Sequence, residues 1–247
     1  MAYDTQSQTT PRYGAGTQTA EIDKGLRAYM LRVYNYMASG LLLSGIVALA
    51  IVNTELESIF YAQSAQGMGL TTIGMIAMFA PLGLLLIGMF AGASMSATAT
   101  QGLYWAFVTL QGVSISMLLQ IYTGESVVRV FFITAAAFAS LSLYGYTTKR
   151  DLTGLGKFMF MGLIGIVIAA IVNIFLGSSM LQFVISGIGV IVFSGLIAYD
   201  TQNIKQRYYE GVGHEEETKM AVWSALALYL NFINLLQFLL YFLGNRE

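Results

Sequence analysis

The residues of this chain that could do chemistry are a few polar side chains set inside long apolar runs. Asp200 is the only acid that lies more than a few residues inside such a run, at the end of FVISGIGVIVFSGLIAYD. A carboxylate at bilayer depth costs about 2.5 to 3.5 kcal/mol by insertion scales, so it normally faces the protein interior or water and often marks an ion or proton path. Asp200 is therefore the first candidate for a gate or a proton-sensing group.

A plainer interpretation of Asp200 is a carboxylate at a helix end. Lys205 and Arg207 follow it and mark the membrane surface, and a rise of about 1.5 Å per residue places Asp200 only about 8 to 10 Å deeper. At that depth the carboxylate could reach the headgroups or pair with Lys205. No other acid occurs between Asp151 and Asp200. This favours a gate or proton-sensing group over a plain helix-end carboxylate without excluding the latter.

Amide side chains form the second candidate group. Asn231, Asn234 and Gln237 recur at i, i+3 and i+6 in one apolar run, so they share roughly one face of a helix. We expect this stripe, together with Gln111 in another run and Lys205 after Asp200, to line an ion path or to pair helices. Counted from a helix start at residue 219, Asn231 lies about 18 Å deep. Contact with the shallower Asp200 therefore requires a tilted helix or an earlier helix start. The sequence by itself does not resolve this difference in depth.

Enzymatic chemistry has no residues to support it. The chain has no cysteine, which excludes thiol catalysis and thiolate metal sites, and it has no phosphate-binding loop, Ser/His/Asp set or pair of catalytic carboxylates. His214, the single histidine, lies in GVGHEEETK and lacks the second histidine of a zinc motif. A formal net charge of −1 argues against nucleic-acid binding. We expect no enzyme, no cofactor and no nucleic-acid partner.

The elements that position these residues are helices that cross a lipid bilayer. Hydrophobic residues make up 56% of the 247 residues and charged residues only 10%, which is unlike a water-soluble domain. A bilayer core about 30 Å thick needs roughly 20 mostly apolar residues as helix. The sequence predicts an all-α, polytopic membrane protein with spans at about 30–52, 70–93, 100–121, 126–147, 158–177, 180–204 and 219–243. Small residues such as the Gly88-x-x-x-Gly92 pair should let these helices pack closely.

The ends of the chain and its basic residues predict the orientation. We expect residues 1–20 to form a disordered, polar cytoplasmic tail and residues 21–247 to form one seven-helix transmembrane domain. Ten of the twelve Lys and Arg residues fall on one side of the predicted spans, which is the cytoplasmic side by the positive-inside rule. The N-terminus is then cytoplasmic, and with seven spans the C-terminus lies outside.

Several longer stretches carry a family pattern. The clearest are SLYGYTTKRDLTGLGKFMFMGLIGIVIAAIVNIFLGSS, FSGLIAYDTQNIK and LALYLNFINLLQFLLYFLGNRE. Two further stretches fit the same pattern, MFAPLGLLLIG and YTGESVVRVFFITAAAFASLSLYGYTTK. In these stretches the chain resembles the bacterial branch of the Bax inhibitor-1 (transmembrane Bax inhibitor motif) family. The resemblance runs from about residue 25 to the end. It implies a bundle in which two groups of three helices surround a central C-terminal helix, in a bacterial inner membrane.

The resemblance also implies a pH-sensitive leak of Ca²⁺ across the membrane. In the family, two aspartates on the sixth and seventh helices share protons near the cytoplasmic mouth and govern closure, and the first of them maps onto Asp200. The second maps onto residue 231 in LYLNFIN, where the family usually has L-Y-L-D-F-I-N and this chain has Asn231. An amide cannot share a proton with a carboxylate, although it can donate to the ionised form or accept from the protonated form. We therefore expect weakened pH gating and only a weak, transient contact of Asp200 with Ca²⁺.

Three functions stay open at this point. The first is a passive cation leak, with Ca²⁺ as the transported ion and Asp200 and Asn231 as the gate. The second is a membrane-embedded regulator without pore activity, because the resemblance also implies that some bacterial relatives modulate a membrane-bound AAA protease. The third is a proton-coupled transporter, which is weakened by the single buried titratable group and by the lack of a clear inverted repeat.

Overall fold

The computed structural model describes residues 15–64, 67–208, 211 and 213–245 of the chain. Seven helices in this part are long and apolar enough to cross a membrane, which confirms the predicted all-α, multi-pass architecture. They are α1 (Ala15–Asn53), α3 (Thr72–Ala91), α4 (Ala97–Ile121), α5 (Gly124–Thr147), α6 (Thr153–Leu176), α7 (Ser179–Arg207) and α8 (His214–Leu243).

The helices extend beyond the apolar runs that predicted them. The helix α1 begins at Ala15, so residues 15–20 of the expected disordered tail are helical in the structure, while the remainder of that prediction lies outside the described residues. The helix α8 begins at His214, five residues before the predicted span. Hydropathy marks only the part of a helix that needs an apolar environment. The helix itself continues into polar sequence, because each residue added to an existing helix forms one more backbone hydrogen bond.

Polar breaks between the spans contain the residues that start the helices. The hydroxyl oxygens of Thr71, Ser96, Thr123 and Ser178 each accept a hydrogen bond from the backbone N–H three residues later. Such N-caps satisfy one of the four N–H groups that a helix start leaves without an intrahelical partner. The short connections therefore define where α3, α4, α5 and α7 begin.

The sequence did not predict the small structure between the first two spans. A short helix α2 (Glu57–Phe60) precedes two antiparallel strands, β1 (Tyr61–Ser64) and β2 (Gly67–Leu70), in which Tyr61 pairs with Leu70. The Tyr61 side chain is buried, and its hydroxyl lies 2.9 Å from Ser116 Oγ on α4. This contact is between distant parts of the sequence, so no local pattern announces it.

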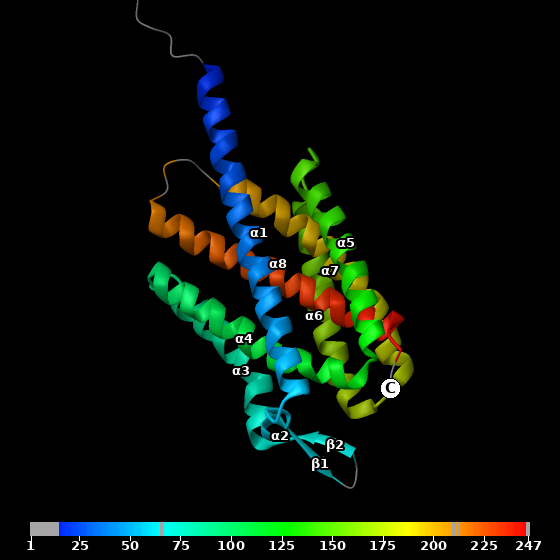
Figure 1. The fold of residues 1–247 in the computed structure, drawn as a ribbon. Coiled ribbons are helices and arrows are strands. Elements are labelled where there is room, and N and C mark those ends of the chain that lie inside the picture. The colour runs from blue at the N-terminus through cyan, green and yellow to red at the C-terminus, as the bar shows by residue number, and fades with distance from the viewer. Residues whose placement is uncertain (1–14, 65–66, 209–210, 212, 246–247) are drawn as a thin grey trace, which may run out of the picture.

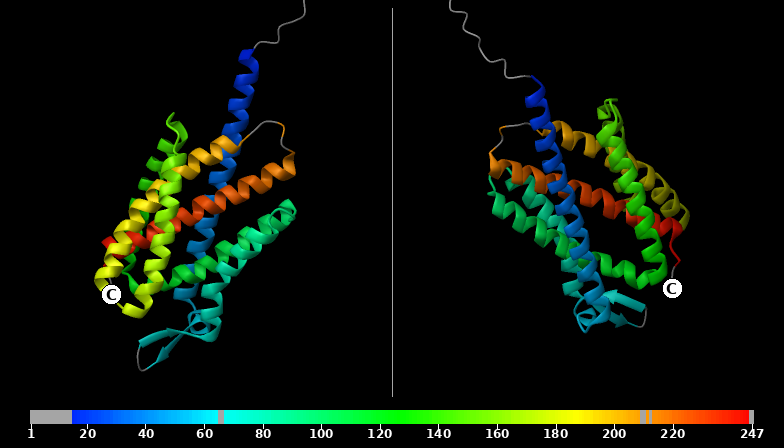
Figure 2. Two further views of the ribbon diagram at one scale, coloured as in Figure 1. Left: turned by 180° about the vertical axis from the view of Figure 1, so that it is seen from behind. Right: turned by 45° about the horizontal axis from the view of Figure 1, so that its top comes forward.

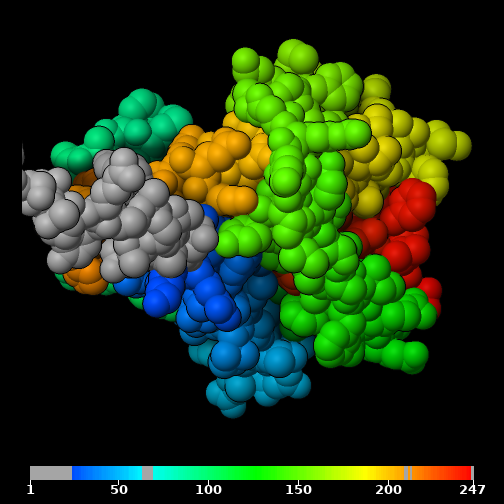
Figure 3. All heavy atoms as spheres, turned by 90° about the horizontal axis from the view of Figure 1, so that it is seen from above, coloured from blue at the N-terminus to red at the C-terminus, as the bar shows by residue number. Residues whose placement is uncertain are grey.

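The helix α8 lies inside the bundle. It packs against α1 and α4 and also against α5 and α7, and half of its most apolar window is buried, the largest share of any span. Elsewhere α1 packs on α4, α4 on α3, α5 on α7 and α7 on α6. Figures 1 and 2 show α8 crossing α1 obliquely, and they show the start of α1 and the C-terminal end at opposite ends of the molecule. Figure 3 views the molecule from above.

Candidate functional site

Asp200 on α7 and Asn231 on α8 are in direct contact. The Asn231 amide donates a hydrogen bond from Nδ2 to Asp200 Oδ2 at 2.6 Å. Asn231 is buried, with 6% of its surface exposed, and Asp200 is partly buried. The two side chains that the sequence placed at different depths therefore meet inside the bundle.

The path of α8 explains how they meet. The first turns of α8 lie against the connection between α3 and α4, where Ala97 N donates to Glu215 Oε1 at 3.3 Å and Lys219 Nζ donates to Ala93 O at 3.5 Å. The start of α8 is consequently displaced from the end of α7, as Figure 1 shows. Because of this displacement and its oblique course, α8 presents Asn231, well along its length, to Asp200 near the end of α7.

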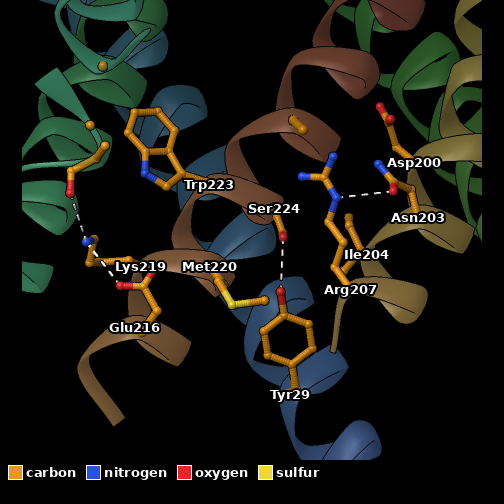
Figure 4. Close-up of a pocket in the computed structure, with 14 residues that line it drawn as sticks. Tyr29, Asp200, Asn203, Ile204, Arg207, Glu216, Lys219, Met220, Trp223 and Ser224 are labelled. Carbon is orange, nitrogen blue, oxygen red and sulfur yellow. Dashed lines mark hydrogen bonds and ion pairs between the residues drawn. The ribbon is translucent and has the colours of Figure 1, made fainter. Parts of the chain in front are cut away.

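A polar cavity of about 610 Å³ lies on one side of this contact and is shown in Figure 4. We call it the vestibule, and its lining residues are Tyr29, Gly88, Gly92, Ala93, Asp200, Asn203, Ile204, Arg207, Glu216, Lys219, Met220, Trp223, Ser224 and Ala227. Two charges of each sign are present among them. Arg207 Nε donates to Asn203 Oδ1 at 3.2 Å, Tyr29 Oη lies 3.1 Å from Ser224 Oγ, and Lys219 pairs with Glu216 at 3.1 Å.

A larger and mostly apolar cavity of about 1,120 Å³ lies on the other side. We call it the lateral groove; its walls come from α3 and α6, and its floor from α4, α7 and α8. Asp200 and Ala227 line both the vestibule and the lateral groove, and Asn231 lines the groove. The hydrogen bond between Asp200 and Asn231 therefore lies where the two cavities adjoin.

The remaining amides of the sequence prediction gather on the floor of the lateral groove. Gln111, Asn234 and Gln237 all line it. Asn234 also donates from Nδ2 to the Leu230 carbonyl of its own helix at 2.7 Å. The i, i+3, i+6 stripe of α8 thus faces one cavity, together with Gln111 from α4.

Lys205 does not join this group. Its Nζ donates to the Tyr146 carbonyl at 2.8 Å and lies 4.9 Å from the centre of the Tyr146 ring. The alternative in which Asp200 pairs with Lys205 is therefore not what the structure contains. Lys205, which the sequence offered for an ion path or for helix pairing, joins α7 to α5 through this bond. Five residues along a helix do not bring two side chains onto one face, whereas three or four do.

Several lining residues of the vestibule escaped the sequence analysis. Tyr29, Asn203 and Ser224 are ordinary polar residues, and only their convergence from α1, α7 and α8 makes them neighbours. The Gly88-x-x-x-Gly92 pair, expected to bring helices together, accommodates the Trp223 ring, since a Cβ at either glycine would collide with it. Within the described residues no group of three or more His, Cys, Asp or Glu side chains could hold a metal ion.

Comparisons with known proteins agree on one family. The family model described as "Inhibitor of apoptosis-promoting Bax1" matches residues 26–247. An uncharacterized protein of Caulobacter vibrioides is 50% identical over 230 residues, covering 92% of both chains, and one of Rickettsia prowazekii is 49% identical over 225 residues, covering 91% of this chain and 92% of the relative. The inner membrane protein YbhL of Escherichia coli K12 is 40% identical over 232 residues, covering 90% of this chain and 94% of the relative. The chain therefore belongs to the Bax inhibitor-1 family of multi-pass membrane proteins.

Proposed function

We propose that this protein is a passive cation leak in which the Asp200–Asn231 hydrogen bond is the closed gate. The supporting observation is its position, because this 2.6 Å contact lies where the vestibule adjoins the lateral groove. Separating α7 from α8 by a few ångströms at this point would join the polar space of the vestibule to the amide stripe of the groove. Asn234, Gln237 and Gln111 then line the next part of the route.

The chemistry of the route suits a cation that passes without being held. Ca²⁺ prefers six to eight oxygen ligands that include carboxylates. The gate offers one carboxylate, and the amides beyond it contribute neutral carbonyl oxygens. A transported ion must bind well enough to enter and weakly enough to leave. One acid with several amides is therefore a weak transit site for Ca²⁺.

The asparagine at position 231 changes what pH can do to this gate. A pair of carboxylates in contact shares protons, so its attraction or repulsion depends on pH. Asn231 does not titrate, and its amide can hold Asp200 by donating to the ionised carboxylate or accepting from the protonated one. We propose that the gate of this protein responds less to pH than a gate with two aspartates.

Calcium flux into proteoliposomes tests the proposal. The purified protein should leak Ca²⁺ with a shallow pH profile, and Asn231→Asp should steepen that profile around neutral pH. Asp200→Ala, which removes the acid of the gate, should change the rate. Identical pH profiles for the parent and Asn231→Asp would overturn the gating proposal, and absence of flux from the parent at every pH would overturn the leak itself.

Absence of flux would favour the second candidate, a membrane-embedded regulator of a membrane-bound AAA protease. The observation that favours it is again Asn231, because a stable amide–carboxylate bond keeps the junction closed. For either function we propose location in the bacterial inner membrane, where the name of the Escherichia coli relative places that protein. The N-terminus would then lie in the cytoplasm and the C-terminus outside.

A further inference from the structure

The lateral groove opens on the lipid-facing surface between α3 and α6. Its lip consists of apolar side chains that are more than half exposed, with Phe79 at 63% and Leu82 at 58% on α3, and Phe160 at 57% and Met161 at 62% on α6. Both helices are candidate membrane spans, so this lip lies in the hydrocarbon region. A concave apolar space of about 1,120 Å³ at that depth slightly exceeds a typical ligand pocket of about 300 to 1,000 Å³, and the bilayer itself offers hydrocarbon to fill it.

One end of the groove carries a positive charge. Lys157, in the first turns of α6, lines the groove and is exposed. Among the described residues it has no ion-pair partner within 4.0 Å. The pKa of the exposed Asp151, in the connection before α6, is lowered mainly by hydrogen bonds with Thr153 and to a smaller extent by the charge of Lys157. A lysine at the end of a span attracts the phosphate of an anionic lipid.

The charge and the apolar lip follow one another along α6. Lys157, Phe160 and Met161 lie at i, i+3 and i+4, so they share one face of the helix. A phospholipid has the same order of groups, a phosphate at the membrane surface followed by a hydrocarbon chain. A net negative phospholipid matches both the charge and the apolar lip, whereas in a zwitterionic phospholipid such as phosphatidylcholine the ammonium group offsets the charge of the phosphate.

We propose that the lateral groove binds one acyl chain of an anionic phospholipid from the leaflet at the N-terminal end of α6, with its phosphate on Lys157 and its chain between the lips of α3 and α6. Binding does not depend on the proposed leak. If the protein does conduct cations, the chain forms the missing side wall of the route and separates the amides of the floor from the surrounding lipid.

Lipid retention tests the charged end of the site. The protein is reconstituted in equal parts of phosphatidylglycerol and phosphatidylcholine, re-extracted, and examined by native mass spectrometry. The parent should retain phosphatidylglycerol in preference, and Lys157→Gln should reduce that retention about fivefold, the effect of one lysine near an anionic lipid. Lys149→Gln is the matched control, because Lys149 is exposed before α6 and does not line the groove. Equal retention by Lys157→Gln and the parent, or an equal loss in Lys149→Gln, would overturn the proposal.

Fluorescence quenching by brominated lipids tests the apolar end independently. Phe160→Trp places an indole at the lip, whereas Phe175→Trp places one on an 85% exposed position of the same helix outside the groove. After subtraction of the parent signal, brominated phosphatidylglycerol should quench the first indole more than brominated phosphatidylcholine does, and both lipids should quench the second equally. Equal quenching at residue 160 contradicts a selective site. No quenching there means that protein, from a second copy or a partner, fills the groove.

Discussion

The hydroxyl of Tyr229 on α8 lies 2.6 Å from Ser44 Oγ on α1, and neither side chain has any exposed surface. Ser44 Oγ is also 2.7 Å from the Val108 carbonyl of α4 and 2.9 Å from the Gly40 carbonyl of α1. The serine can donate to a carbonyl while it accepts from the tyrosine. Three helices are therefore joined at one polar point within the apolar core, on the side of α8 that faces α1 and α4.

We predict that Tyr229→Phe destabilises the bundle without unfolding it. The change removes one interhelical hydrogen bond and leaves the ring in place, so the loss in free energy of unfolding should be about 0.6 to 1.7 kcal/mol, the range for such bonds in membranes. Thermal unfolding in detergent measures it. Tyr144→Phe is the control, because that side chain is 46% exposed. Equal melting temperatures for the two variants would contradict a stabilising role for the Tyr229 hydroxyl.

Asn231→Leu should destabilise the protein more than Asn234→Leu does. The first change leaves the partly buried Asp200 without its 2.6 Å donor, whereas Asn234 donates only to a carbonyl of its own helix. A buried polar group that loses its partner costs about 1 to 3 kcal/mol. Chemical denaturation of the two variants side by side measures the difference. The expectation fails if Asn234→Leu is as damaging as Asn231→Leu.

Alanine at two glycines of α3 should have opposite effects. A Cβ at Gly88 would collide with the Trp223 ring, so Gly88→Ala should displace the indole, make it more accessible to acrylamide quenching, and lower the melting temperature. A Cβ at Gly83 would have no neighbour within 4 Å, and Gly83→Ala should be neutral or stabilise by up to about 1 kcal/mol through helix propensity. Unchanged fluorescence in Gly88→Ala would show that Trp223 does not rest on this glycine.

Gln202→Leu should loosen the connection between α5 and α6. The buried Gln202 side chain accepts from Leu152 N at 2.8 Å and donates to the Arg150 carbonyl at 2.8 Å, so the change leaves two backbone groups without partners. We expect a loss of about 1 to 3 kcal/mol and faster trypsin cleavage after Arg150. Gln206→Leu, at an exposed position of the same helix, is the control. Equal cleavage rates in both variants would be the contrary result.

The sequence by itself determined the class of protein and the identity of its unusual residues. Long apolar runs predict spans because the bilayer demands about 20 apolar residues for each helix, a local requirement that needs no tertiary information. The same requirement makes Asp200 and the Asn231, Asn234 and Gln237 stripe stand out, since polar groups at membrane depth must be accommodated by something. The family membership followed from several long sequence motifs that occur along the chain in the order expected for the family.

Only the tertiary structure decided which of these residues meet. Depth counted along the helices placed Asp200 and Asn231 at different levels, and the displaced, oblique α8 brings them into hydrogen-bonding contact. The tertiary structure also places Lys205 against the Tyr146 carbonyl and forms the two strands β1 and β2 next to the buried Tyr61. The physical reason is that hydropathy has no information on how helices tilt and rotate against their neighbours, which depends on side-chain packing and hydrogen bonds between residues far apart in the chain.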